Sequence, residues 1–129
     1  MLPDEHTETF PDPLNPERLA ELTAGEQLEQ YRGYLKSENS RIRGLHDQGR
    51  GGCEIASLRS GVIDLLLRSL FRTATLRNST PPVLSLMANG GYGRGLLNPS
   101  SDIDLLFLLP QPSHRLVQKE RKLVEGILY

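Results

Sequence analysis

Two aspartates separated by one residue, Asp102 and Asp104, stand at the start of the apolar run DIDLLFLL. Alternate side chains of a β-strand point to the same face and lie roughly 6.5–7 Å apart along it. The two carboxylates therefore project together from the mouth of a strand predicted over residues 103–109. Two like charges in such a place are unfavourable unless a cation neutralises them. Because hard oxygen ligands suit Mg²⁺ or Mn²⁺, we predict that Asp102 and Asp104 bind Mg²⁺.

A glycine-rich segment lies about ten residues before these acids. Gly90 and Gly91 follow the apolar residues 83–87, which are flanked by breakers and predict a buried strand. Glycine permits a tight turn and lets a phosphate approach backbone N–H groups closely. Arg94 can hold an anionic oxygen through charge-assisted hydrogen bonds. One strand end thus supplies phosphate donors and the next supplies metal ligands, which predicts a site for a metal-bound nucleoside triphosphate.

Two simpler phosphate-binding motifs do not fit this segment. A Walker loop would need Lys and Ser or Thr where Leu96 and Leu97 stand, and a dinucleotide fingerprint would need a third glycine at Leu96. The spacing of the glycines and the two acids therefore favours the metal-dependent site.

The elements that must position this site are helices before it and strands around it. Residues 1–19 are acidic and proline-rich and predict a flexible lead-in. Thr23 and Glu26 form a capping box at the start of a helix of about 20 residues. A second apolar stripe predicts a helix over residues 53–75. The predicted organisation is a helical segment at 20–77, then a partial core at 78–129.

The last part of the chain predicts one more helix. Ser113 can cap it, and its apolar face would contain Leu116, Val117, Leu123, Val124, Ile127 and Leu128. The pattern is still helical at Tyr129, so the sheet and its flanking helix are expected to be incomplete. The predicted fold class is α+β, with two N-terminal helices followed by the start of a mixed sheet.

Composition limits the class of protein. The 129 residues carry 15 basic and 16 acidic side chains, and this balance argues against a dedicated nucleic-acid binder. The apolar runs are too short to span a bilayer, and no targeting segment is visible. The single cysteine, Cys53, is expected to be buried and fits a reducing compartment. We therefore expect a cytoplasmic protein with no membrane or nucleic-acid partner.

The order strand, Gly-Gly, about ten residues and Asp-x-Asp resembles the polymerase-beta-type nucleotidyltransferase superfamily. Within it, GGYGRG followed by PSSDIDLL is most similar to the bifunctional PII uridylyltransferase/uridylyl-removing enzyme family, and RSGVIDLLLRSLF looks like the helix that leads into its domain. The resemblance covers about residues 55–129.

This resemblance implies a transferase of nitrogen regulation that moves UMP from UTP to a tyrosine of a PII signalling protein and releases pyrophosphate. It implies that Asp102 and Asp104 hold two Mg²⁺ ions. Gly90, Gly91, Arg94 and Ser101, the last within the SDIDLL motif, would then bind the nucleotide.

The sequence departs from the family pattern in two places. Asn89 replaces a small apolar residue, and Leu96 replaces a glutamate. The third carboxylate of such enzymes is also not found, because the acids after Asp104 are Glu120 and Glu125, both in a helical pattern. We therefore expect a fragment that is inactive in isolation.

Two other readings stay open. A protein adenylyltransferase acting on glutamine synthetase has a comparable Gly-Gly and Ser-Asp-x-Asp layout, although GGYGRG favours the uridylyltransferase. A non-catalytic remnant that binds a nucleotide or a PII protein is the third possibility.

Overall fold

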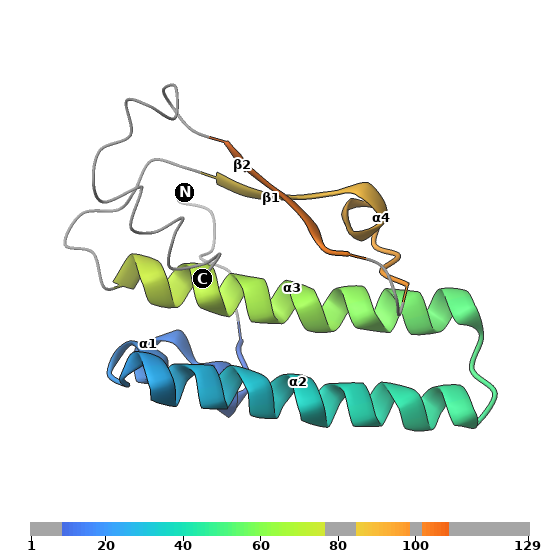
Figure 1. Cartoon of the computed structure of the whole chain (residues 1–129), viewed down its shortest axis with the longest axis horizontal. Helices are drawn as coiled ribbons and strands as arrows, with labels where there is room; N and C mark the ends of the chain where they lie inside the picture. Colours follow the sequence, from blue (N-terminus) through green and yellow to red (C-terminus); the bar gives the residue numbers. More distant parts are fainter. Residues whose placement is uncertain (1–8, 77–84, 99–101, 109–129) are drawn as a thin grey trace, which may run out of the picture.

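The computed structural model describes residues 9–76, 85–98 and 102–108 as two layers (Figure 1). One layer is an antiparallel pair of long helices, α2 (Ala24–Asp47) and α3 (Gly52–Leu76). The other contains the strands β1 (Ser85–Asn89) and β2 (Asp104–Leu108) with the short helix α4 (Gly90–Gly93) between them, and it lies along α3. This arrangement confirms the predicted α+β class.

Both long helices confirm their sequence predictions. The Thr23 hydroxyl accepts a hydrogen bond from the Glu26 amide at 3.2 Å, and the Glu26 carboxylate accepts one from the Thr23 amide at 3.4 Å. This capping box satisfies amides that have no partner within the first turn. After α2, Gly49 turns the chain with a φ of +92°, in the region that glycine adopts readily.

The core forms where α3 packs against its neighbours on both sides. Its larger cluster of buried residues is Leu14, Leu19, Tyr31, Ile63, Leu66, Tyr92 and Leu97. A smaller cluster joins Ile42, Ile55 and Val62 between α2 and α3. Because Tyr92 and Leu97 belong to the segment that follows β1, α3 connects the helical pair to the layer that carries the glycines and the acids.

The prediction of a flexible lead-in over residues 1–19 is wrong from Asp12 onward. A 3₁₀ turn, η1 (Asp12–Leu14), and a short helix, α1 (Pro16–Ala20), pack on the long helices. Leu14 is 0% exposed and Leu19 is 1% exposed. Pro16 is compatible with this order, since proline is favoured in the first turn of a helix. Two deeply buried leucines therefore outweigh an acidic, proline-rich composition; residues 1–8 lie outside the described ranges.

The two strands pair antiparallel, with Asn89 opposite Asp104 and Ser85 opposite Leu108. Both predicted strands exist, although residues 83, 84 and 109 lie outside the described part. The prediction that these strands are buried is wrong, because Leu86 in β1 and two residues of β2 are the ones that are even half-buried. Leu105 and Phe107 are half-buried, whereas Leu106 and Leu108 on the opposite face are exposed.

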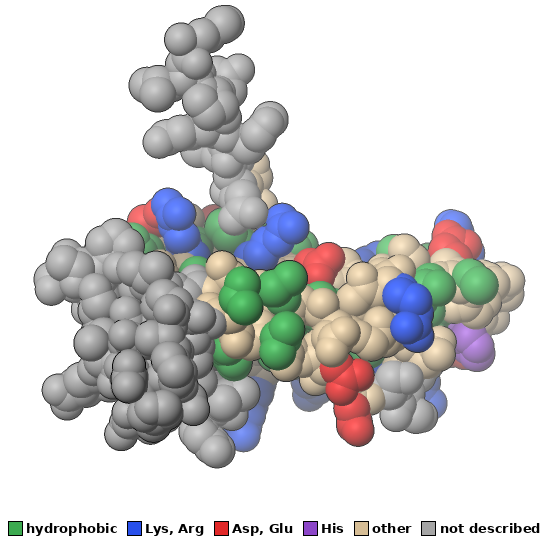
Figure 2. Space-filling view, turned by 90° about the horizontal axis from the view of Figure 1, so that it is seen from above, with side chains coloured by type: hydrophobic (Ala, Val, Ile, Leu, Met, Phe, Trp, Pro, Cys, Tyr) green, Lys and Arg blue, Asp and Glu red, His purple; other side chains and the backbone are tan. Residues whose placement is uncertain are grey.

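The physical reason is that α3 lies against only one face of this sheet. Figure 2, turned by 90° from Figure 1 so that the molecule is seen from above, shows a small group of hydrophobic side chains near the middle of this face. The helix predicted after Ser113 lies outside the described residues. None of the described helices is long and apolar enough to cross a membrane.

Candidate functional site

Strand pairing brings the glycine segment and the acids together. Gly90 follows Asn89, the last residue of β1, and Asn89 pairs with Asp104, the first residue of β2. In an antiparallel pair, the end of one strand lies beside the beginning of the next. The glycine turn and the Asp-x-Asp motif therefore meet at one end of the sheet.

Gly90 makes room for a carboxylate. Its φ is +60°, and a Cβ built on it would overlap with Oδ2 of Asp104 and lie 3.3 Å from Cγ of the same residue. A side chain at this position would therefore be strained and would also displace the Asp104 carboxylate. The sequence predicts that glycine is needed here so that a phosphate can approach the backbone N–H groups. In the structure, glycine is needed because a side chain would collide with the Asp104 carboxylate.

Four of the six predicted site residues line one open cleft of about 750 Å³: Gly91, Arg94, Asp102 and Asp104. This volume lies within the range of about 300–1,000 Å³ that is common for small-molecule sites. Gly90 lies beside the cleft, next to Asp104. Ser101 lies outside the described residues, so its role remains a prediction.

Part of the wall of the cleft comes from the first turns of α3, and sequence reasoning missed it. Gly52, Cys53 and Ala56 line the cleft together with Leu96 and Asn98. The pattern of α3 indicated only a scaffold, because nothing in its apolar stripe marks a site. The prediction that Cys53 is buried is wrong: its side chain is exposed, since it stands at the solvent end of the helix beside the cleft.

The donors of the cleft fit a hard divalent cation. Asp102 and Asp104 are both exposed and both line it. Carboxylate pairs that share a site in this way are stabilised by a cation. Among the described residues, no group of three or more His, Cys, Asp or Glu could hold a metal ion. The described part of the cleft therefore offers two carboxylates to the predicted Mg²⁺.

Backbone hydrogen bonds within the segment 91–96 hold it in a compact turn. The amide of Leu96 donates to the Gly91 carbonyl at 3.1 Å, and the amide of Gly95 donates to the Tyr92 carbonyl at 2.9 Å. A Cβ on Gly91 would lie 3.3 Å from the Leu96 carbonyl oxygen and 3.8 Å from Nη2 of Arg94. Gly91 thus sits where the loop is narrow, with the Arg94 guanidinium close by.

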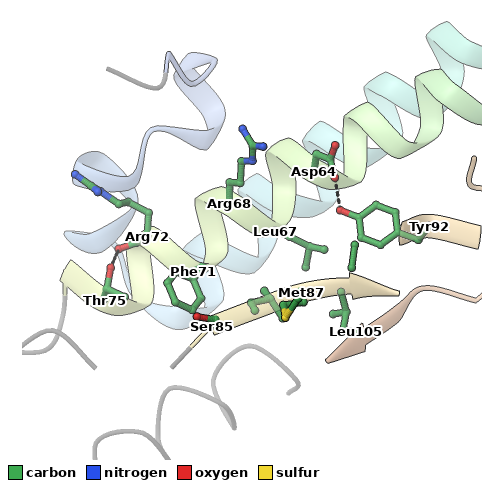
Figure 3. A pocket seen from close by; sticks show the side chains of 12 residues that line it. Asp64, Leu67, Arg68, Phe71, Arg72, Thr75, Ser85, Met87, Tyr92 and Leu105 are labelled. Carbon is green, nitrogen blue, oxygen red and sulfur yellow. Dashed lines mark hydrogen bonds between the residues drawn. The ribbon is translucent and has the colours of Figure 1, made fainter. Parts of the chain in front are cut away.

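A second hollow of about 540 Å³ lies between α3 and β1 (Figure 3). None of the predicted site residues lines it. Its carboxylate, Asp64, accepts a hydrogen bond from the Tyr92 hydroxyl. Burial, and then this hydrogen bond, raise the pKa of Tyr92 above its ordinary value. The Asp64 carboxylate therefore serves the internal structure, and the cleft with Asp102 and Asp104 is the candidate site.

Comparison with known proteins places the same region in a family. The model of the family described as "Nucleotidyltransferase domain" matches residues 69–129. A bifunctional uridylyltransferase/uridylyl-removing enzyme of Phenylobacterium zucineum is 40% identical over 119 residues, which are 82% of this chain and 12% of the relative. The enzyme of the same name from Caulobacter vibrioides is 40% identical over 89 residues, which are 64% of this chain and 9% of the relative.

A third such enzyme, from Rhodopseudomonas palustris, is 46% identical over 67 residues, which are 47% of this chain and 7% of the relative. The chain thus spans about an eighth or less of the length of these relatives. No solved structure matches the chain at a significant level.

Proposed function

We propose that this chain takes part in transferring UMP from UTP to a protein. The basis is that the chain belongs to the nucleotidyltransferase family and is related to bifunctional uridylyltransferase/uridylyl-removing enzymes. The proposed acceptor is a tyrosine hydroxyl of a PII signalling protein, and pyrophosphate is the proposed second product. The observation that carries this proposal is the convergence of Gly91, Arg94, Asp102 and Asp104 on one cleft. Each of these residues has a role in such a reaction.

The two aspartates would hold Mg²⁺ at the edge of the cleft. When bound, the metal would neutralise charge on the triphosphate and favour loss of the proton from the attacking hydroxyl. Asp102 and Asp104 provide the negative charge that keeps such a cation at the start of β2. Without them, Arg94 would be the one charged side chain among the described residues of the cleft.

The glycine segment would bind the phosphates. Gly91 presents backbone without a side chain to the cleft, so an anionic oxygen can approach closely. Arg94 follows at the end of α4 and also lines the cleft. Its guanidinium can make charge-assisted hydrogen bonds to phosphate oxygens. In the transfer itself, the hydroxyl oxygen forms a bond to the α-phosphorus while the bond to the pyrophosphate oxygen breaks.

Magnesium-dependent UTP binding tests the proposal directly. Asp102→Asn and Asp104→Asn should each lower the affinity for UTP at least about tenfold in the presence of Mg²⁺, since each removes a charged ligand of the metal. Isothermal titration calorimetry with and without EDTA measures the metal-dependent part. Asp47→Asn is a matched control, because Asp47 lies exposed at the end of α2.

Unchanged affinity in both cleft variants would remove the metal assignment. Titration with ATP in parallel distinguishes the uridylyltransferase from an adenylyltransferase, since preference for ATP would favour the second.

We further propose that the 129-residue chain alone binds Mg·UTP without detectable transfer, because its described residues offer two carboxylates to the metal. Incorporation of labelled UMP into a PII protein by this chain, lost in Asp102→Asn, would contradict that proposal.

A further inference from the structure

The short helix α4 carries a single side chain. Three of its four residues, Gly90, Gly91 and Gly93, are glycines, so Tyr92 makes all of its side-chain contacts. Tyr92 is 5% exposed and belongs to the main core cluster. The position of the glycine backbone at the cleft therefore depends on how Tyr92 is held.

Tyr92 is held by α3. Its ring packs in the core, and its hydroxyl donates a hydrogen bond to Oδ1 of Asp64 (Figure 3). A hydrogen bond with a carboxylate is stronger than one between neutral groups. This contact attaches the beginning of the loop to the middle of the long helix.

The end of the same loop is attached to α3 as well. The Leu97 amide donates to the Ser60 hydroxyl at 2.9 Å and to the Ala56 carbonyl at 3.2 Å. Leu97 is 1% exposed, and Ser60 is buried too. Ser60 and Asp64 are four residues apart, so they lie on the same face of α3, one turn from each other. The loop from Gly90 to Leu97 is thus bound to one face of α3 at two points.

These attachments surround the residues that line the cleft. Gly91, Arg94 and Leu96 lie between or beside the two attachment points, and the internal hydrogen bonds of the loop join them to one another. A glycine-rich segment loses much conformational freedom when it becomes ordered. Attachment before binding removes that loss from the binding step, which is the physical basis of preorganisation.

We infer that Asp64 and Ser60 are positioning residues for the proposed nucleotide site: through Tyr92 and Leu97 they hold the glycine loop in the conformation that receives the triphosphate. This inference rests on the proposed function, since it needs a nucleotide in the cleft. Neither residue lines the cleft. Their effect on binding is exerted through the loop.

Two variants remove the attachments with the smallest change of shape. Tyr92→Phe keeps the ring and loses the hydroxyl, and it should weaken Mg·UTP binding about fivefold to tenfold. Ser60→Ala should weaken it less, because the Leu97 amide keeps the Ala56 carbonyl as acceptor. Asp64→Asn should stay close to the unchanged protein, since its side-chain oxygen can still accept from Tyr92, whereas Asp64→Leu should behave like Tyr92→Phe.

The chain offers a matched control for each variant. Tyr31→Phe removes another buried tyrosine hydroxyl, which lies 3.3 Å from the Thr73 hydroxyl on α3. Ser69→Ala removes another buried serine of α3, whose hydroxyl donates to the Leu14 carbonyl at 2.7 Å. Both controls should lower the melting temperature and leave the affinity for Mg·UTP unchanged, because neither contact involves the loop.

The experiment measures calorimetric affinity for Mg·UTP, melting temperature and hydrogen exchange of the Leu96 and Leu97 amides on the full chain. Support requires weaker binding and faster exchange in Tyr92→Phe and Ser60→Ala, with neither change in the controls. Equal losses of affinity in variants and controls would overturn the positioning role, because general stability would then explain them.

Two further outcomes separate this inference from the proposed function. Unchanged affinity in Tyr92→Phe and Ser60→Ala would overturn the inference alone, provided that Asp104→Asn still weakens binding. If Asp104→Asn also binds normally, the proposed function fails and the inference fails with it.

Discussion

Replacing Gly90 with alanine separates two requirements that the structure places on this position. The first is backbone conformation, because the φ of Gly90 is +60°. An alanine held in the left-handed region costs about 1–2 kcal/mol. The second is space, because the new methyl group would overlap with Oδ2 of Asp104. Gly90→Ala should therefore destabilise the fold and also move a proposed metal ligand.

Gly95→Ala is the control that contains only the first requirement. Its φ is +75°, and a Cβ built on it has nothing within 4 Å. Both variants should lose a similar free energy of unfolding, which corresponds to a decrease in melting temperature of about 5–10 °C. The losses are similar because Asp104 is exposed and its carboxylate can turn into solvent at small cost to stability.

Binding should distinguish the two variants. Displacement of a metal ligand or of its support typically costs about 10- to 100-fold in metal affinity. Gly90→Ala should therefore lose about this factor in affinity for Mg·UTP, and Gly95→Ala should lose little. Circular dichroism melting and isothermal titration calorimetry measure the two quantities on the same samples. Equal affinities for the two variants would refute the argument that Gly90 is needed to place the Asp104 carboxylate.

Three other predictions follow from single positions. Gly91→Val should weaken Mg·UTP binding at least about tenfold, because its Cβ would lie 3.3 Å from the Leu96 carbonyl oxygen beside the cleft. It should lower the melting temperature by less than Gly90→Ala does, because Gly91 is not in the left-handed region; unchanged affinity in calorimetry would mean that this glycine only makes a turn. Burial and a carboxylate hydrogen bond raise the pKa of Tyr92 above 10.0, so the unfolded chain releases this proton at lower pH than the folded chain. The melting temperature should therefore fall as the pH rises above about 10, and the fall should be smaller in Tyr92→Phe, with a remainder from Tyr34, whose pKa burial also raises; an identical pH profile would contradict the assignment. Leu14→Ala should cost about 2–5 kcal/mol in urea unfolding, because Leu14 is fully buried; a loss below about 1 kcal/mol would show that η1 is not part of the core.

The long helices could be predicted because their determinants are local. The Thr23–Glu26 capping box marks the start of α2, and helical periodicity marks α3. The same local logic failed for residues 12–19, where composition indicated a flexible segment. Leu14 and Leu19 are ordered by burial against distant helices, and no local pattern records which surface will receive them.

The set of candidate site residues also came from the sequence, because Gly91, Arg94 and the two aspartates are defined by residue type and spacing. That set remains a prediction as regards function. Its placement on a single cleft depends on strand register, which pairs Asn89 with Asp104 across the sheet. Register is a non-local property, so the sequence alone does not specify which residue of one strand pairs with which residue of the other.

Tertiary structure alone decided what surrounds these residues. Gly90 faces the Asp104 carboxylate, Tyr92 reaches Asp64, and Leu97 reaches Ser60, each across a separation of 14 to 37 residues along the chain. In the sequence, Ser60 and Asp64 are two polar positions on an apolar helix. They gain a structural role only when the chain folds back, because a hydrogen bond between distant residues depends on geometry that neither residue determines by itself.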